Sequence, residues 1–314
     1  MDADDSHRTA PDIDDATDRF EWWARAALLL GVLSVLAWAV VWLRLGVPSV
    51  YAQVFAIPIL GGLTLPVALW GLARTVFRPP VVRWRRGVAF AALLAVGFFG
   101  NVPLFAVPLA TEGWTSEHRY RLPFDGEWDT LAGGPRVDRN YHALTAAYRW
   151  GYDFAPRRDG ERAEGDGEQN ADYYCFGRPV LAAAPGEVVR VQRGKEDSAP
   201  GEIGTSSVLG NHVVIRVDRR EYLFTAHLKK GSLAVEEGER VERGERLGAC
   251  GSSGRAMRPH LHVHLQTSER FPFAQGLPLR FSHYVADGER VDRGMPLGEG
   301  EGGTPPGQTV RPVE

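Results

Sequence analysis

The sequence predicts a membrane protein in two parts: three N-terminal transmembrane helices, followed by a compact antiparallel β sandwich or barrel. The first part is predicted by three long stretches without charged residues, at 26–43, 50–73 and 87–110. The second is predicted by short apolar stretches separated by turn residues after residue 136, a pattern typical of all-β domains. A chain of 314 residues has room for both parts, and its formal net charge of -3 gives no indication of nucleic-acid binding.

The N-terminal region is predicted to be a membrane anchor. Residues 1–25 are rich in aspartate and lack apolar periodicity, so we expect a disordered tail. Each uncharged stretch within 26–110 is long enough to cross a hydrocarbon core of about 30 Å as a helix, whereas buried helices of soluble proteins rarely lack charge over such a length. Five arginines lie in 74–86, which the positive-inside rule places in the cytoplasm. The N-terminus is then cytoplasmic, the chain is multi-pass, and residues after 110 are extracytoplasmic.

The rest of the chain is predicted to form one β domain with irregular flanks. Residues 111–136 contain several glycines and prolines and are interpreted as a linker, and residues 299–314 as a disordered tail. The β domain is expected at 137–298, where turn residues such as Pro185-Gly186 separate the apolar stretches. Strands are expected at 152–155, 180–183, 187–191, 212–217, 222–226 and 261–266.

Three histidines alternate with aliphatic residues at 260–265, in and directly before the last of these strands. In a β-strand, residues two apart share a face, so His260, His262 and His264 are expected to point to one side. A single histidine is more often structural than functional. Three at this spacing, after a glycine-rich approach, favour a metal site, because neutral imidazole is the commonest metal ligand.

Several motifs, taken in order, resemble one known family. They are Gly151-x-Asp153, the segments 179–188 and 210–215, Thr225-Ala226-His227-Leu228, Gly251-Ser252-Ser253-Gly254 and Pro259-His260-Leu261-His262. Over roughly residues 140–268 the chain is similar to the lysostaphin/LytM-type zinc metallopeptidase domains. This resemblance implies an antiparallel β fold with a zinc-binding groove. It also implies cleavage of peptide cross-links in bacterial cell walls, although some members are inactive and regulate other hydrolases.

The resemblance assigns roles to four residues. Asp153 and His262 match zinc ligands, whereas His227 and His260 match the pair that positions the attacking water and stabilises the oxyanion. A catalytic zinc requires three protein ligands and an open position for water. The resemblance therefore implies a third ligand.

The position of that third ligand departs from the family pattern. Where the family has a histidine four residues before the aspartate, this chain has Arg149, whose guanidinium offers no lone pair to a metal. His142 is the first candidate replacement, and the segment Asn140-Tyr141-His142 together with Arg149 resembles a divergent branch of the family. His264, His212 or a cysteine are weaker candidates. Alternatively, Arg149 pairs with Asp153 in the place of zinc, and the domain is an inactive binding or regulatory module.

Cys175 and Cys250 are both expected outside the membrane, where disulfides persist. A disulfide between them is favoured over two free thiols or a zinc ligand. The sequence thus predicts a membrane-anchored, extracytoplasmic zinc metalloendopeptidase. Its predicted cofactor is one zinc ion, and its predicted partner is a peptide or a cell-wall peptide.

Overall fold

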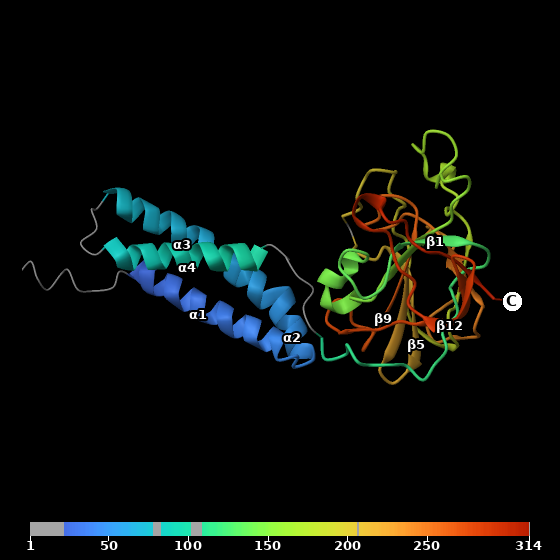
Figure 1. Cartoon of the computed structure of the whole chain (residues 1–314), viewed down its shortest axis with the longest axis horizontal. Coiled ribbons are helices and arrows are strands. Elements are labelled where there is room, and N and C mark those ends of the chain that lie inside the picture. The colour runs from blue at the N-terminus through green and yellow to red at the C-terminus, as the bar shows by residue number, and fades with distance from the viewer. Residues whose placement is uncertain (1–21, 78–82, 102–108, 206, 314) are drawn as a thin grey trace, which may run out of the picture. The chain divides into compact units, whose positions relative to one another are not determined.

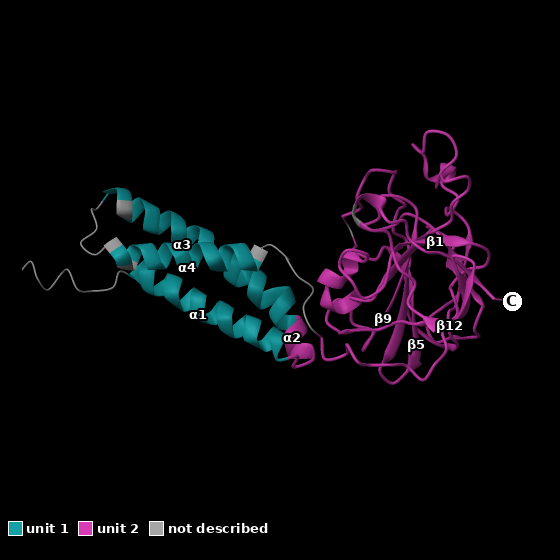
Figure 2. Cartoon of the chain, viewed as in Figure 1, with its two compact units in different colours: residues 1–43, 51–104 teal, residues 44–50, 105–314 magenta. Residues whose placement is uncertain are grey.

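The computed structural model describes residues 22–77, 83–101, 109–205 and 207–313. The chain divides into two compact units, which Figure 2 shows in different colours. Residues 1–43 and 51–104 form the first unit, and residues 44–50 and 105–314 form the second. The predicted disordered tail falls mostly on residues 1–21, which lie outside the described residues.

The first unit is helical, as Figure 1 shows. Buried Trp23 and Ala27 from one helix pack with Leu93 from another, so small and large apolar residues together hold the helices side by side. The chain from Val47 to Phe77 is continuously helical and includes a π-helical stretch at Ala52–Ala56. The helices are α1 (Trp22–Trp42), α2 (Val47–Tyr51), α3 (Ile57–Phe77) and α4 (Arg83–Asn101).

Two helices of the described chain, not three, are long and apolar enough to span a membrane. They are Trp22–Trp42 and Val47–Arg74, judged by length and composition alone. The prediction of three spans is corrected, because helix α4 starts within the arginine-rich segment 74–86 and its apolar part, Arg86–Gly100, is too short. A membrane-spanning helix needs about 20 apolar residues. Residues 102–108 of the predicted third span lie outside the described residues.

The second unit is built on antiparallel strands, which confirms the predicted fold class for this part of the chain. An 11-stranded sheet and a two-stranded sheet contain all the strands of the described residues. The strands of the large sheet are β1 (Trp128–Ala132), β2 (Tyr152–Ala155), β4 (Gly186–Gln192), β5 (Asn211–Asp218), β6 (Glu221–Leu228), β7 (Arg240–Val241), β9 (Leu261–Gln266), β10 (Gly276–Leu277), β11 (Phe281–Ala286), β12 (Glu289–Gly294) and β13 (Thr309–Pro312). Those of the small sheet are β3 (Pro179–Leu181) and β8 (Arg246–Ala249).

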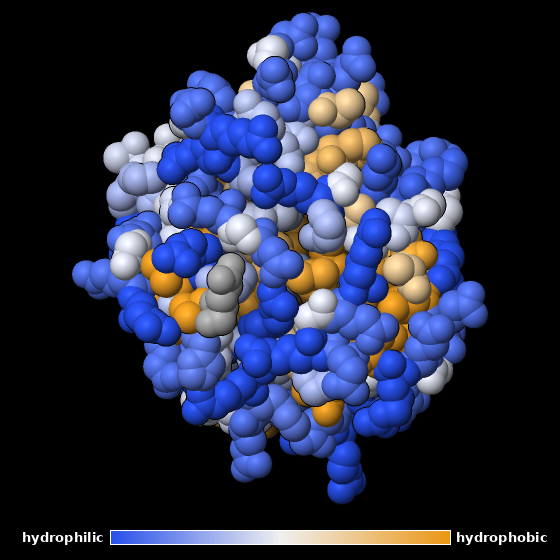
Figure 3. All heavy atoms as spheres, turned by 90° about the vertical axis from the view of Figure 1, so that its right-hand side faces the viewer, coloured by the Kyte–Doolittle hydropathy of each residue, from blue (hydrophilic) through white to orange (hydrophobic). Residues whose placement is uncertain are grey.

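The order of strands in the large sheet is β12-β11-β13-β1-β2-β9-β6-β5-β4-β7, with β10 beside β9. Figure 1 labels β1, β5, β9 and β12 of this sheet. Strands β2, β9 and β6 are therefore neighbours although they are far apart in sequence. One face of this sheet packs with residues of the small sheet in a single apolar core, to which Phe154, Val263 and Leu223 contribute from the large sheet and Val180 and Leu247 from the small one. The face of the molecule in Figure 3 is mostly hydrophilic, with scattered apolar patches.

All six strands predicted from the apolar pattern are present, β2 and β9 with the predicted bounds. The predicted linker and tail are wrong in part. The linker contains β1, and the C-terminal tail contains β13, which pairs with both β1 and β11. Trp128 and Val310 from these strands are buried in the core, and this non-local pairing stabilises segments whose local sequence resembles loops.

Cys175 and Cys250 form a disulfide, with their Cα atoms 5.7 Å apart. The predicted bond is thus confirmed over the two alternatives. It ties the segment before β3 to the end of β8. Residue Gly251, next to Cys250, forms a bridge with His260, so the bond braces the chain that leads into β9.

Candidate metal centre

The strand order brings Asp153 and His262 together. Asp153 on β2 is directly opposite His262 on β9, and Ala226 on β6 is opposite His262 on the other side. Their neighbours Tyr152 and Leu261 point into the main core. Because side chains alternate along a strand, Asp153 and His262 project from the opposite face of the sheet.

His142 reaches this face from a short turn upstream of β2. The turn, Tyr141–Leu144, is a 3-10 helix capped by Asn140, whose side-chain oxygen accepts from the His142 backbone N–H at 3.1 Å. The Asn140 amide also donates to the carbonyls of Gly134 at 2.8 Å and Gly151 at 3.2 Å. Asn140 therefore fixes the turn that carries His142 to the start of β2.

Three potential ligand atoms converge at this point. His142 Nε2 lies 3.0 Å, and His262 Nδ1 2.8 Å, from the same oxygen of Asp153, and the three groups lie within 4.8 Å of one another. All three residues are buried, with exposed fractions of 7, 1 and 3% for His142, Asp153 and His262.

The donor set fits zinc. Two imidazole nitrogens and one carboxylate oxygen are the three protein ligands of many catalytic zinc sites, and about 3.3 Å separates ligand atoms in a tetrahedral shell with bonds of about 2.0 Å. His142 Nε2 is buried and has no hydrogen-bond partner among the described residues, although it lies 3.0 Å from Asp153 Oδ1. A buried polar atom without a partner is unfavourable unless another group binds it. A metal ion would satisfy it.

The electrostatics favour the ligand-competent forms. Burial lowers the pKa of His262 from 6.5 to about 4, so its imidazole is neutral near pH 7. Burial alone raises the pKa of Asp153, but the adjacent imidazoles of His142, His260 and His262 outweigh it. They hold that pKa well below its ordinary value. Metal ligands must be deprotonated, and both residues meet this condition.

Two further residues shape the centre. Tyr141 donates its hydroxyl to the second oxygen of Asp153, which leaves the first oxygen facing the histidines. Gly151 leaves space for two ligands, since a Cβ atom there would lie 3.0 Å from His262 Cε1 and 3.4 Å from His142 Cδ2.

His227 and His260 lie beside this group, with ring centroids 4.7 Å apart. Each places Nδ1 within hydrogen-bond distance of a backbone carbonyl, His227 at 2.8 Å from Ser253 O and His260 at 2.9 Å from Arg258 O. A carbonyl only accepts, so Nδ1 carries the hydrogen in both rings and Nε2 keeps its lone pair. Nε2 of His260 lies 3.7 Å from Asp153.

The backbone at His227 is strained and turns the side chain toward the centre. His227 has φ +60°, and the register with β5 shifts at this point. Before it, Leu223 faces the main core while Phe224 and Ala226 face away. After it, Leu228 faces the core again. The left-handed residue thus breaks the alternation, as a β-bulge does when it re-aims a side chain.

The glycine-rich approach supplies the partner of His227. Gly210 and Gly254 both have positive φ and lie so close that a Cβ on Gly254 would come within 2.4 Å of the Gly210 nitrogen. This contact seats the loop against the start of β5. The carbonyl of Ser253 in that loop is the acceptor for His227.

The structure places Arg149 and the two weaker histidine candidates away from the three converging atoms. Arg149 donates to the Ala143 carbonyl at 3.2 Å and forms an ion pair with Glu112 at 3.4 Å. His212 Nδ1 lies 2.9 Å from Gly210 O, and His264 Nδ1 lies 2.9 Å from His262 Nε2 on the side opposite the Asp153 contact.

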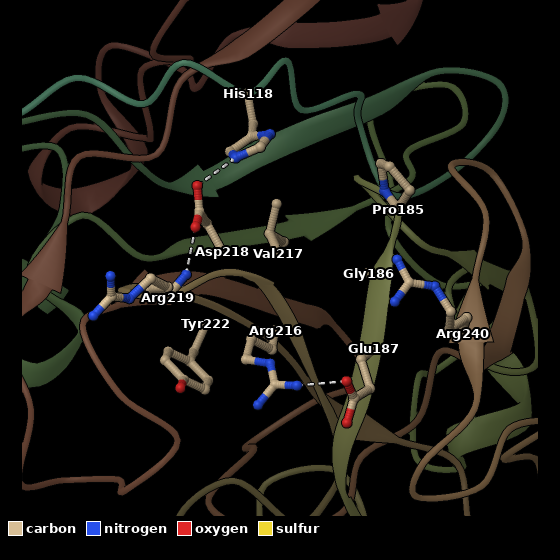
Figure 4. A pocket seen from close by; sticks show the side chains of 10 residues that line it. All are labelled: His118, Pro185, Gly186, Glu187, Arg216, Val217, Asp218, Arg219, Tyr222 and Arg240. Atoms are coloured by element: carbon tan, nitrogen blue, oxygen red, sulfur yellow. Dashed lines mark hydrogen bonds and ion pairs between the residues drawn. The ribbon is translucent and has the colours of Figure 1, made fainter.

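Other residues of interest were not singled out by the sequence. Tyr148 packs its ring against His142, His262 and His264, and no local motif marks it. A separate pocket of about 580 Å³ (Figure 4) includes His118 and Asp218, joined at 3.1 Å, and Arg216 paired with Glu187. His118 and Asp218 form a second cluster of possible metal ligands with Glu221, in which the side chains of the first two are 38% and 55% exposed.

Part of the β unit is similar to a known protein family. Residues 169–272 match the model of peptidase family M23, and this confirms the resemblance inferred from the motifs. The match includes His227, His260 and His262 and begins after His142 and Asp153. No curated protein matched the chain.

Several solved structures are similar to this chain at low identity. A zinc-containing peptidase from Vibrio cholerae is 20% identical over 52% of this chain, with TM-score 0.33, and this chain spans only 40% of that protein. A variant catalytic domain of a prophage-encoded M23 protein from Enterococcus faecalis is 23% identical over 50% of this chain and 93% of that domain, with TM-score 0.34. The catalytic domain of lysostaphin from Staphylococcus simulans is 18% identical over 48% of this chain and 88% of that domain, with TM-score 0.29.

Proposed function

We propose that this chain, in which residues 169–272 carry a peptidase family M23 domain, is a zinc metalloendopeptidase. His142, Asp153 and His262 hold the metal, and His142 takes the place that Arg149 leaves vacant in the family pattern. One observation carries the proposal. Three buried ligand atoms converge, and one of them, His142 Nε2, has no hydrogen-bond partner among the described residues.

The residues around the metal divide the chemistry of peptide hydrolysis. When bound, zinc lowers the pKa of a water molecule and polarises the carbonyl of the scissile bond. His227 and His260 carry Nε2 lone pairs on rings 4.7 Å apart beside the centre, which suits proton transfer from the attacking water to the departing amine. Once protonated, either ring donates a hydrogen bond that stabilises the oxyanion.

The substrate class follows from the family. M23 domains usually act on peptides of bacterial cell walls, so we propose a cell-wall peptide as the substrate. The apolar helices Trp22–Trp42 and Val47–Arg74 are proposed to anchor the chain, with the β unit outside the cytoplasm. Two spans return the chain to the side on which it began, so the cytoplasmic N-terminus expected from three spans is not part of this proposal. The disulfide between Cys175 and Cys250 supports an oxidising compartment for that unit.

The second candidate function is an inactive binding or regulatory module of the same fold. Arg149 at the usual ligand position favours it. Arg149 contacts Ala143 and Glu112 instead of Asp153, and this argues against an inactive module in which the guanidinium occupies the metal position. The two functions differ in one measurable respect, since only the first requires peptide-bond cleavage.

The test uses the full-length protein in detergent with zinc and cell-wall peptides, with products identified by mass spectrometry. We expect cleavage by the parent. We expect His227→Ala and His260→Ala to keep zinc and lose activity by about 10²-fold or more, because general acid–base groups contribute that much. Asp153→Ala and His262→Ala should lose the metal itself.

His118→Ala is the matched control, because His118 lies in the separate pocket and should leave cleavage unchanged. A parent that binds zinc and cleaves no peptide would favour the regulatory module. Full activity in both His227→Ala and His260→Ala would contradict the assigned roles.

A further inference from the structure

Three side chains on β9 form a continuous hydrogen-bonded chain that starts at a proposed ligand. His262, His264 and Gln266 share one face of the strand, with exposed fractions of 3, 0 and 0%. His262 Nε2 lies 2.9 Å from His264 Nδ1, and His264 Nε2 lies 3.3 Å from Gln266 Oε1. Gln266 Nε2 donates to the carbonyl of Ser268 at 2.6 Å.

The end of this chain fixes the direction of every bond in it. A carbonyl oxygen only accepts, so Gln266 directs its amide NH₂ to Ser268 and its oxygen to His264. His264 must then carry its hydrogen on Nε2 and its lone pair on Nδ1. That lone pair accepts from His262, so His262 carries its hydrogen on Nε2.

The lone pair of a neutral His262 therefore lies on Nδ1, which is 2.8 Å from the carboxylate oxygen of Asp153. Two acceptors at this distance repel each other unless a cation lies between or beside them. A metal ion bound to both atoms removes the conflict. The chain thus selects the tautomer of His262 that a metal at this centre requires.

The ring of His264 has support besides its hydrogen bonds. It stacks on Phe224 with centroids 4.5 Å apart and an interplanar angle of 14°. Phe271 and Tyr148 also contact it, at centroid distances of 6.0 and 5.7 Å. An aromatic ring without nitrogen can therefore occupy the same space, which separates packing from hydrogen bonding in a variant.

We propose that His264 and Gln266 are positioning residues that hold His262 in the tautomer and orientation needed to bind the metal through Nδ1. This inference rests on the metal site of the proposed function. Outer-shell partners of ligating histidines commonly change metal affinity by about 10- to 100-fold. In this proposal His264 is a hydrogen-bond partner of the ligand His262. It is not itself a ligand, although the sequence left that role open.

The experiment measures the zinc dissociation constant of the full-length protein by competition with a chromophoric chelator. His264→Phe keeps the stacking and removes the acceptor, and we expect it to weaken zinc binding by about 10- to 100-fold. His264→Asn offers a side-chain oxygen near the position of Nδ1 and should recover most of that loss. Gln266→Leu should weaken binding as well, because it frees His264 to adopt the other tautomer.

The matched control is His212→Phe, a buried histidine near the same phenylalanine that contacts Gly210 instead of the chain. It should leave the dissociation constant unchanged. Ring ¹⁵N NMR of the zinc-loaded parent should show His262 and His264 each with the hydrogen on Nε2.

Unchanged affinity in His264→Phe would overturn the inference, as would equal losses in the Phe and Asn variants or a hydrogen on Nδ1 of His262. These outcomes leave a zinc-binding parent and so spare the proposed function. A parent that binds no zinc would overturn the metal site and the inference together.

Discussion

Replacing Gly151 by alanine adds a single methyl group that touches two of the three proposed ligands. The new Cβ would lie 3.0 Å from His262 Cε1 and 3.4 Å from His142 Cδ2, whereas ordinary contact begins at 3.4 Å. The ring of His262 must therefore retreat by about 0.4 Å, and metal–ligand distances tolerate only about 0.2 Å. The same Cβ would also lie 3.0 Å from the backbone oxygen of Tyr148.

The size of the effect follows from the cost of overpacking. Adding a methyl group to a well-packed region costs about 1–3 kcal/mol, and 1.4 kcal/mol corresponds to tenfold in an equilibrium constant. If this strain is relieved by displacing the ligands, zinc binding weakens by about tenfold or more. Folding stability is expected to change less, because alanine restricts the unfolded chain and offsets part of the strain by about 0.4–1 kcal/mol.

The assay is chelator competition for the zinc dissociation constant, with urea unfolding of the same samples. Gly113→Ala provides the control, because the same methyl group there meets nothing within 4 Å. An affinity for zinc equal to that of the parent, in a Gly151→Ala protein that is otherwise folded, would refute the geometry assigned to His142 and His262.

Two further predictions concern stability. Cys175→Ser should lower the free energy of unfolding by about 4 kcal/mol, since the disulfide with Cys250 closes a loop of 75 residues. Urea unfolding without reductant measures this difference, and a change under 1 kcal/mol would contradict the prediction. The metal-free protein should lose stability as the pH falls from about 6.5 to 4. Burial lowers the pKa of His262 to about 4, so on acidification the imidazole of this residue is protonated in the unfolded chain before it is protonated in the folded one. The pKa shift of His262 corresponds to about 3 kcal/mol of unfolding free energy, which is fully present above pH 6.5 and is lost as the pH falls through 4. A His262→Gln variant should show a smaller fall in denaturant titrations across that range, and an equal fall would assign it to other groups.

The strands that the sequence predicted correctly are those whose signal is local. Strand β9 alternates imidazole and aliphatic side chains between two faces, and β2 has the bounds expected from its apolar residues. Strands β1 and β13 escaped prediction, because each is short and lies in a stretch rich in glycine and proline. Their stability comes from pairing with each other across the whole length of the β unit.

The candidate site divides in a similar way. The common face of His260, His262 and His264 follows from strand periodicity alone. The reach of His142 does not, since it depends on a turn held by Asn140 against backbone carbonyls of other segments. The orientation of His227 depends on its positive φ. Strict alternation along the strand would place its side chain on the other face of the sheet.

The membrane part shows why composition alone overcounts spans. An uncharged stretch and a helix need not share their ends. Helix α4, the third predicted span, begins among arginines at Arg83, and only its part Arg86–Gly100 is apolar. Length of helix, and not length of uncharged sequence, decides whether a segment can cross a bilayer.

The metal content of the full-length protein, measured beside its His142→Ala variant, tests the central claim most directly. The account predicts one zinc ion per chain in the parent after dialysis against excess zinc, and loss of that ion in the variant. Zinc retained by the variant would show that another residue completes the site, and the absence of zinc from the parent would contradict a metal centre at His142, Asp153 and His262.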